Sequence, residues 1–234
     1  MRQKKAILGR ILAIGDIHGC LDPLNLLLDR LRPAPSDTIV TLGDVVDRGP
    51  DSRGVIERLI ALRSECCLVT LKGNHDEMML AARDDAAAAR EWQAVGGMET
   101  LESYCGGLSR VPEAHWIFLE SCIDFWETDT HFFVHGNVYP DEPLVEQPKH
   151  KLFWGGFDGA QPHISGKIMV CGHTSQKSGR PKNLGYAVCI DTYAHGGQWL
   201  SCLDVGTGIV TQASIDGDIR EVNLSDFIER PNEL

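Results

Sequence analysis

Short apolar segments alternate with amphipathic ones along the first part of the chain. The segments 11–14, 38–42 and 67–71 are β-branched or apolar and are bounded by turn residues, which indicates buried strands. After the first of them, leucines recur at helical spacing, and Asp22-Pro23 predicts a helix start with Asp22 as the N-cap. A second helix with a mostly apolar face is predicted from Ser52. The pattern is therefore strand, polar loop and helix, repeated.

Residues 78 to about 130 depart from this pattern. Their alanine-rich and charged segments, broken by glycine and proline, predict a helical subdomain, 78–130, within a single domain that covers 1–234. Strands resume at 131–134 and 167–171, and three more strand-like segments follow, at 187–190, 199–203 and 209–213. We expect those last three to form a second sheet packed on the first. The predicted fold is α/β, a layered β-sandwich flanked by helices with a helical insertion.

The composition is that of an ordinary globular protein, and it limits the cellular compartments and the classes of binding partner that we expect. No run of about 18 apolar residues occurs, so we expect no membrane span. The N-terminal stretch 1–10 has a basic start but too few apolar residues for a signal peptide. The net charge of -11 opposes non-specific binding to nucleic acid, and eight cysteines without a CxxC pair favour reduced thiols. We expect a cytoplasmic protein.

The loop that follows the second predicted strand concentrates charged side chains. After a glycine that permits a sharp turn, it places Asp44, Asp47 and Arg48 close together. Two carboxylates beside a guanidinium suit a metal ion and a phosphate held side by side. The alternative is a turn in which the two aspartates cap backbone groups. The other strand ends favour the metal site.

Five strand-like segments end in a glycine that is followed, directly or nearly so, by a potential metal ligand. The carboxyl ends of parallel strands gather at one edge of a sheet, so these side chains are expected to converge. Carboxylate, imidazole and amide ligands together favour Mn, Fe, Co or Zn, and six of them suit two ions about 3.5–4 Å apart bridged by one carboxylate. The predicted ligands are Asp16, His18, Asp44, Asn74, His135 and His173.

The motifs Gly-Asp-x-His-Gly, Gly-Asp-x-x-Asp-Arg-Gly and Gly-Asn-His-Asp/Glu, in this order, resemble the signature of the calcineurin-like metallophosphoesterases. The Asp-Arg-Gly sequence is similar to that of the phosphoprotein phosphatase family. Four further segments resemble its bacterial serine/threonine phosphatases: 96–104, 134–136, 152–154 and 172–174. Wider relatives carry a histidine at the position of Ser175, whereas the phosphoprotein phosphatases do not.

This resemblance implies a role for each site residue. Asp16 and His18 are expected to hold the first metal, Asp44 to bridge both metals, and Asn74, His135 and His173 to hold the second. His75 resembles the general acid of the family, oriented by Asp47, and Arg48 resembles a phosphate-binding arginine. The expected cofactors are two divalent ions, most simply manganese, with Fe, Zn or Co as alternatives.

One departure from the family pattern concerns phosphate binding. Bacterial relatives place an arginine soon after the Leu-x-Trp motif, whereas here Trp154 is followed by Gly155-Gly156-Phe157. Arg180, Lys177 or Lys182 is a candidate replacement, and the alternative is that these residues form a solvated basic loop. Tyr193 and His195 are expected to line the cleft.

The predicted activity is hydrolysis of phosphoserine and phosphothreonine in a phosphoprotein or phosphopeptide. A water between two divalent ions loses a proton near neutral pH and attacks phosphorus, Arg48 stabilises the phosphoryl charge, and His75 protonates the leaving alkoxide. The alternatives are a symmetrical dinucleoside tetraphosphate hydrolase and a non-catalytic scaffold. The segment 96–104 and the compact length favour the phosphatase, and the intact ligand set disfavours the scaffold.

Overall fold

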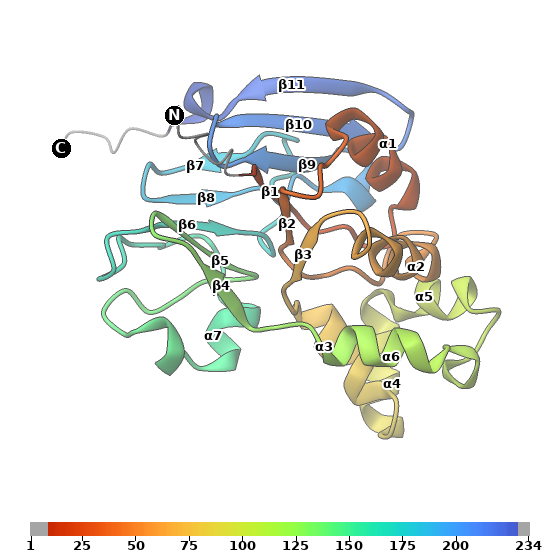
Figure 1. Cartoon of the computed structure of the whole chain (residues 1–234). Helices are drawn as coiled ribbons and strands as arrows, with labels where there is room; N and C mark the ends of the chain where they lie inside the picture. Colours follow the sequence, from red (N-terminus) through yellow and green to blue (C-terminus); the bar gives the residue numbers. More distant parts are fainter. Residues whose placement is uncertain (1–8, 229–234) are drawn as a thin grey trace, which may run out of the picture.

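Two β-sheets pack face to face, and helices cover the outer face of each (Figure 1). The computed structural model describes residues 9–228. Residues 1–8 of the N-terminal stretch, for which a signal peptide was rejected above, lie outside the described residues. This arrangement confirms the predicted α/β sandwich flanked by helices.

The larger sheet combines a parallel and an antiparallel half. β1, β2 and β3 are parallel, whereas β9 runs antiparallel to β1 and continues into the antiparallel strands β10 and β11. In spatial order the sheet consists of β11 (Ile219–Asn223), β10 (Ile209–Ser214), β9 (Trp199–Asp204), β1 (Ile11–Ile14), β2 (Thr38–Thr41) and β3 (Cys67–Thr70).

The smaller sheet has a parallel centre and antiparallel edges. β5, β6 and β8 are parallel, and β4 and β7 flank them. In spatial order it consists of β4 (Phe125–Glu127), β5 (His131–Val134), β6 (Ile168–Cys171), β8 (Ala187–Cys189) and β7 (Lys182–Asn183).

The prediction that the last three strand-like segments form the second sheet was wrong. Only β8 joins the smaller sheet, while β9 and β10 extend the larger one from the free edge of β1. Hydrophobic alternation identifies a strand but not the edge that accepts it. The two-residue β7 and the three-residue β4 were too short to be predicted, and β4 lies within the segment that was predicted to be helical.

The core lies in three layers because successive strand residues face opposite sides of each sheet. Ala13 and Val40 of the larger sheet pack against Phe133 and Val170 of the smaller sheet. Leu12 and its neighbours face the helices on the outer side of the larger sheet, and a third cluster lies between the smaller sheet and α7. Since both faces of the central strands are buried, these strands position the loops at their ends rigidly.

The seven α-helices within residues 9–228 are α1 (Leu21–Leu31), α2 (Ser52–Leu62), α3 (Asn74–Ala82), α4 (Ala86–Trp92), α5 (Met98–Ser103), α6 (Glu113–Glu120) and α7 (Lys149–Trp154). The first begins at Leu21 with Cys20 as its N-cap, so the predicted cap at Asp22 was wrong. Asp22 instead lies in the first turn, where a carboxylate favours the helix dipole. The second begins at Ser52 as predicted, capped by Asp51, which accepts a hydrogen bond from the Gly54 N–H.

Helices occupy the chain between β3 and β4, where the insertion was predicted. The run from α4 to α5 passes through a π-helical turn, Gln93–Gly97, whose Gly96 has φ 126°. Trp92, Phe118 and Leu119 of this region pack into the cluster under the larger sheet. The helical region is thus continuous with the main core, and its π-helical turn contacts the loop after β2 through Gly96.

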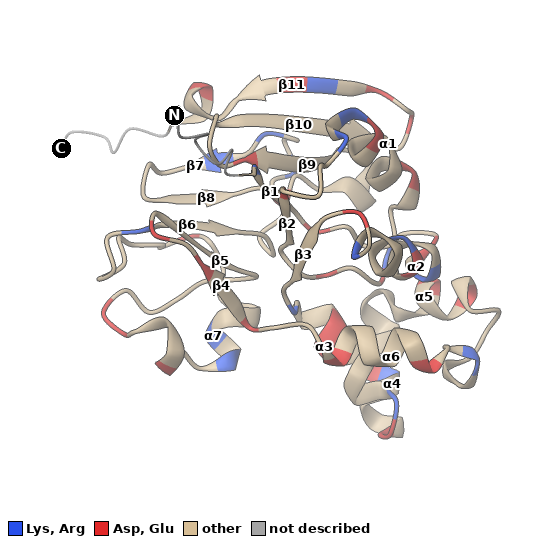
Figure 2. Ribbon diagram, viewed as in Figure 1, with Lys and Arg blue, Asp and Glu red and all other residues tan. Residues whose placement is uncertain are grey.

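Charged residues of both signs are interspersed over the helices and β11 (Figure 2). All eight cysteines are free thiols, as predicted. No helix within residues 9–228 is long and apolar enough to cross a membrane.

A buried aspartate joins the start of β1 to the turn before β2. Asp37 accepts hydrogen bonds from the Arg10 N–H at 2.8 Å, the Arg10 guanidinium at 2.6 Å and the Ala34 N–H at 2.9 Å. Burial would raise the pKa of Asp37, but these hydrogen bonds hold it below its usual range. The carboxylate therefore stabilises the fold when it is ionised.

We expect Asp37→Asn to lower the free energy of unfolding at pH 7 by about 1–3 kcal/mol, because several charge-assisted hydrogen bonds are lost. An acid with a depressed pKa stabilises the protein above about pH 4 and loses that contribution as the pH falls. The difference between parent and variant in urea unfolding should therefore shrink below pH 4. Asp29→Asn, at an exposed position on α1, is the control. A constant difference down to pH 2 would contradict this account.

Candidate metal and phosphate site

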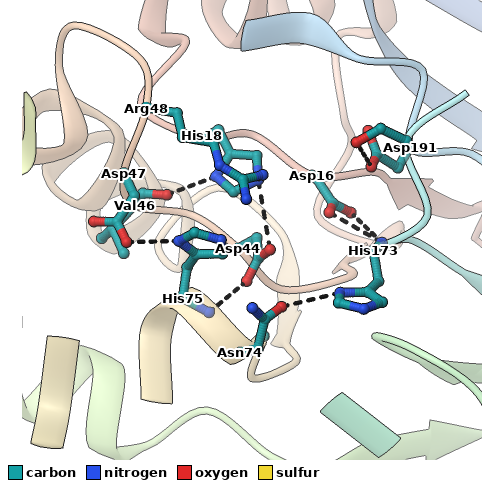
Figure 3. Close-up of polar contacts among 12 residues, drawn as sticks. Asp16, His18, Asp44, Val46, Asp47, Arg48, Asn74, His75, His173 and Asp191 are labelled. Atoms are coloured by element: carbon teal, nitrogen blue, oxygen red, sulfur yellow. Dashed lines mark hydrogen bonds and ion pairs between the residues drawn. The ribbon is translucent and has the colours of Figure 1, made fainter. Parts of the chain in front are cut away.

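The loops at the carboxyl ends of the parallel strands of both sheets converge on one site (Figure 3). The larger sheet contributes the loops after β1, β2 and β3, and the smaller sheet those after β5 and β6. The structure thus brings together every residue that was predicted as a ligand or catalytic group: Asp16, His18, Asp44, Asp47, Arg48, Asn74, His75, His135 and His173.

Asp44 lies at the centre of this site. One of its oxygens, Oδ1, accepts the backbone N–H of His75 at 2.9 Å. The other, Oδ2, is 3.5 Å from His18 Nε2 and 3.4 Å from His135 Nε2. Within residues 9–228, two groups of side chains present metal-ligating atoms within 4.8 Å of one another, His18–Asp44–His75 and Asp44–His135–His173. Asp44 belongs to both groups, which is the position that a bridging carboxylate requires.

Backbone carbonyls set the tautomers of the histidines. His18 Nδ1 donates to the Val46 carbonyl at 2.8 Å, and His135 Nδ1 donates to the Leu42 carbonyl at 2.8 Å. A carbonyl only accepts, so each Nδ1 carries the proton and each Nε2 faces Asp44. Imidazole lone pairs and a carboxylate oxygen that face one another at this distance are the donor set of a divalent cation. The residues therefore fit a metal pair.

Buried acidic groups support the same conclusion. Asp16 is 3% exposed and accepts the backbone N–H of His173 at 3.0 Å. Burial raises the pKa of Asp16 well above its usual value, and the charges of Asp191 and Asp44 add to this. Asp44 is also buried, at 2% exposure, with Oδ2 between the rings of His18 and His135. Cations offset such a concentration of buried carboxylates.

The loops that carry the ligands adopt conformations that side chains usually avoid. His18, Asp44 and His173 all have positive φ, at 44°, 47° and 62°. Such conformations cost about 1–3 kcal/mol each and persist where the surroundings hold them. Two glycines leave room for the ligands, because a Cβ at Gly73 or Gly172 would overlap a carboxylate oxygen of Asp44 or Asp16.

His75 and Asp47 form a buried pair beside Asp44. His75 Nδ1 is 2.8 Å from Asp47 Oδ2, and the His75 ring packs edge-on against His18 with 4.9 Å between centroids. With its Nδ1–H donated to Asp47, the ring is left with Nε2 free for another group. Arg48 extends from the same loop, is exposed, and places Nη1 3.0 Å from His18 Nε2. The imidazole of His75, which can act as an acid or a base, and the guanidinium of Arg48 thus lie next to the predicted metal ligands.

Among the three candidate replacements for the missing arginine, Lys177 is connected to the site by a chain of ring contacts. Its Nζ is 5.8 Å from the centre of the Tyr193 ring, Tyr193 packs on His195, and His195 packs on His18 at 4.7 Å between centroids. By contrast, Lys182 pairs with Asp158 at 3.3 Å. These contacts place Tyr193 and His195 next to His18.

Sequence reasoning missed several residues that contact the predicted site. Asp191 follows β8, is buried, and accepts the Ser175 hydroxyl at 2.7 Å. Trp92 and Thr100 reach Asp47 from the helical region. The position of Asp191 directly after a buried strand was a usable signal, but it follows no glycine. Thr100 lies in the segment 96–104 that resembles the bacterial phosphatases, but that resemblance gave it no role. Trp92 carries no signal, because a buried tryptophan is an ordinary core residue.

Comparison with known proteins places this geometry in a family. Residues 9–203 match the family described as calcineurin-like phosphoesterase. A serine/threonine-protein phosphatase 1 of Salmonella typhimurium is 32% identical over 173 residues, which cover 63% of this chain and 73% of that protein. A symmetrical bis(5'-nucleosyl)-tetraphosphatase of Pseudomonas fluorescens is 32% identical over 138 residues, which cover 58% of this chain and 46% of that protein. The chain therefore spans about half the length of such tetraphosphatases.

Among solved structures, a protein serine/threonine phosphatase of Saccharomyces cerevisiae has the same fold. It superposes with a TM-score of 0.63 over 98% of this chain and 83% of the yeast chain, at 16% sequence identity. At 16% sequence identity, this structural similarity is evidence for the fold alone.

We expect Asp44→Asn to weaken the binding of both metal ions, because Asp44 is the one carboxylate common to the two ligand groups. In calorimetric titration with Mn²⁺, the parent should bind two equivalents and the variant should bind at least one of them about tenfold more weakly or worse. Because metals bind the folded state, Mn²⁺ should raise the thermal midpoint of the parent more than that of the variant. The control is Asp204→Asn, at the opposite end of the β1–β9 pair. Unchanged stoichiometry and affinity in Asp44→Asn would contradict the bridging role.

Proposed function

Because the chain belongs to the calcineurin-like phosphoesterase family, we propose that it is a metal-dependent phosphomonoesterase that acts on phosphoserine and phosphothreonine in proteins. The observation that carries this proposal is the buried His75–Asp47 pair placed beside Asp44 and Arg48. An alkoxide leaves phosphorus slowly unless it is protonated, so a positioned imidazole is of most value for serine and threonine esters. The alignment with most of the Salmonella phosphatase supports the same substrate class.

We propose that Asp16, His18 and Asp44 hold one divalent ion and that Asp44, Asn74, His135 and His173 hold the other, with manganese as the first candidate. Bound there, such a pair supplies Lewis acidity and lowers the pKa of water near phosphorus. Asn74 Oδ1 lies 2.9 Å from His135 Nε2 and 3.0 Å from His173 Nδ1, so the three side chains already point at one place.

The other site residues bind the phosphoryl group and protonate the leaving group. Arg48 is the one guanidinium in the loop after β2 and is exposed, so it can contact the phosphoryl oxygens of an incoming ester. His75, with Nδ1–H held by Asp47, presents Nε2 toward the leaving oxygen and gives it a proton. Asp47 fixes the ring orientation and stabilises the imidazolium form. Lys177, Tyr193 and His195 form the rim on which we propose that the phosphoprotein rests.

A second candidate function is symmetrical cleavage of dinucleoside tetraphosphates. It is supported by the similarity to the Pseudomonas tetraphosphatase, which is as high as that to the phosphatase although it covers less of the relative. In that reaction the leaving group is a nucleotide phosphate, which needs less help from a general acid. The exposed ring of Trp154, 6.4 Å from the His173 ring, is a surface on which a nucleobase can stack.

A substrate panel tests both candidates. Mn²⁺-loaded protein is assayed with phosphoserine, phosphothreonine and phosphotyrosine peptides, p-nitrophenyl phosphate and diadenosine tetraphosphate, and kcat/KM is compared. The proposal expects the phosphoserine and phosphothreonine peptides to lead. A tetraphosphate value higher by a factor of ten or more selects the second function, and hydrolysis of none of them in the presence of metal rejects both.

We expect His75→Asn to reduce kcat on a phosphoserine peptide by about 10²–10⁴-fold, because the alkoxide loses its proton donor. On p-nitrophenyl phosphate, whose leaving group is a stable anion, the loss should be less than about tenfold. The measurement is the ratio of the two kcat values, with His131→Asn on β5 as a matched control away from the site. Equal losses on both substrates would remove His75 from the acid role.

A further inference from the structure

The helical region between β3 and β4 reaches into the predicted site through Asp47. The Asp47 carboxylate is fully buried and accepts from three side chains. One is His75, and the other two are Trp92, whose Nε1 lies 2.9 and 2.8 Å from the two carboxylate oxygens, and Thr100, whose Oγ1 lies 2.8 Å from Oδ1. Trp92 ends α4 and Thr100 lies in α5, so both come from the helical region.

The hydroxyl protons around Asp47 can be assigned by counting. Thr100 has one hydroxyl proton and donates it to Asp47 Oδ1, so in its 2.8 Å contact with Ser52 Oγ the serine is the donor. The Asp47 backbone N–H in turn donates to Ser52 Oγ at 3.0 Å and to Thr100 Oγ1 at 2.9 Å. The side-chain polar atoms of Asp47, Ser52, Trp92 and Thr100 thus all have partners, and these four residues are 0% exposed.

The π-helical turn fixes the donors in place. A Cβ at Gly97 would overlap the Trp92 ring, so the ring packs directly against that glycine. The Gly96 carbonyl accepts the Arg48 backbone N–H at 3.0 Å, and a Cβ at Gly96 would lie 2.6 Å from Arg48 Cγ. The same turn therefore contacts both Asp47 and Arg48, whose φ angles of 74° and 68° need an external support.

We propose that Trp92 and Thr100 are positioning residues that hold the Asp47 carboxylate in the one orientation in which it accepts His75 Nδ1–H and directs Nε2 of His75 at the leaving group. This inference rests on the proposed role of His75 in phosphoester hydrolysis. With one donor removed, the carboxylate turns toward the donors that remain, and the ring of His75 loses its fixed partner. A buried carboxylate with an unsatisfied oxygen also costs free energy.

Four variants separate positioning from folding. Thr100→Val keeps the shape of the side chain but removes the hydroxyl, and Thr100→Ser keeps the hydroxyl. Trp92→Phe removes the indole N–H but keeps an aromatic ring. Trp116→Phe is the matched control, since Trp116 is a buried tryptophan of the same region that packs against Arg83 and, within residues 9–228, donates no hydrogen bond to Asp47.

We expect Thr100→Val and Trp92→Phe to lower kcat on a phosphoserine peptide about tenfold or more, which is part of the general-acid contribution, and to change kcat on p-nitrophenyl phosphate less than about threefold. Thr100→Ser and Trp116→Phe should retain the parent ratio of the two rates. Equal losses on both substrates, or no loss on either, would overturn the proposal. If Trp92→Phe does not fold, the comparison of Thr100→Val with Thr100→Ser is sufficient to test the proposal.

A second measurement does not depend on turnover. In zinc-loaded protein, the Nδ1–H of His75 should give a slowly exchanging, downfield proton resonance coupled to ¹⁵N, with His135 Nδ1–H as an internal reference. In Thr100→Val and Trp92→Phe the His75 resonance should exchange faster while that of His135 is unchanged, and Thr100→Ser should match the parent. An unchanged His75 resonance in both variants overturns the inference, whereas a parent that hydrolyses no phosphoester rejects only the proposed function.

Discussion

The arrangement of the site depends on Asp44, a buried carboxylate that touches both sheets. Its Oδ1 is held by the N-terminus of α3 and its Oδ2 lies between His18 of the larger sheet and His135 of the smaller one. The two sheets therefore meet at this residue through polar atoms, whereas elsewhere they meet through an apolar layer. A pair of cations would satisfy these atoms, since the buried oxygens and the ring nitrogen lone pairs otherwise repel one another. The loops can hold strained backbone conformations because the strands behind them are buried on both faces.

Local sequence was sufficient to predict that the candidate ligands converge, because each follows a strand and the carboxyl ends of parallel strands share an edge. The strand-helix repeats at 11–14, 38–42 and 67–71 likewise fixed the larger sheet's parallel half. The sheet assignment of β9 and β10 could not be predicted, since it depends on the free edge of β1, to which the chain returns nearly two hundred residues later. The same holds for Trp92 and Thr100: their contacts with Asp47 span 45 and 53 residues, and no pattern near them marks the partner.

The helical region between β3 and β4 therefore contributes to both the hydrophobic core and the candidate site. Its apolar residues extend the core under the larger sheet, and its polar atoms at Trp92 and Thr100 complete the surroundings of Asp47. An aspartate of this kind must be both buried and ionised to orient an imidazole, and those requirements conflict unless donors surround the carboxylate. Burial does raise the pKa of Asp47, and the hydrogen bonds from His75, Thr100 and Trp92 oppose that rise. The helical insertion in the sandwich thus supplies two of the hydrogen-bond donors to Asp47 in the loop after β2.

The net charge of the chain sets a further requirement on a site for phosphate. A protein with a formal charge of -11 repels a phosphate dianion unless positive charge is concentrated where the substrate binds. Two divalent ions bring four positive charges against the two ligand carboxylates, Asp16 and Asp44, which leaves an excess that Arg48 extends toward solvent. Lys177 adds a cation at the rim, above Tyr193. The buried carboxylates Asp16 and Asp44 would thus favour cations at the one place where a phosphate needs positive charge, despite the negative charge of the whole chain.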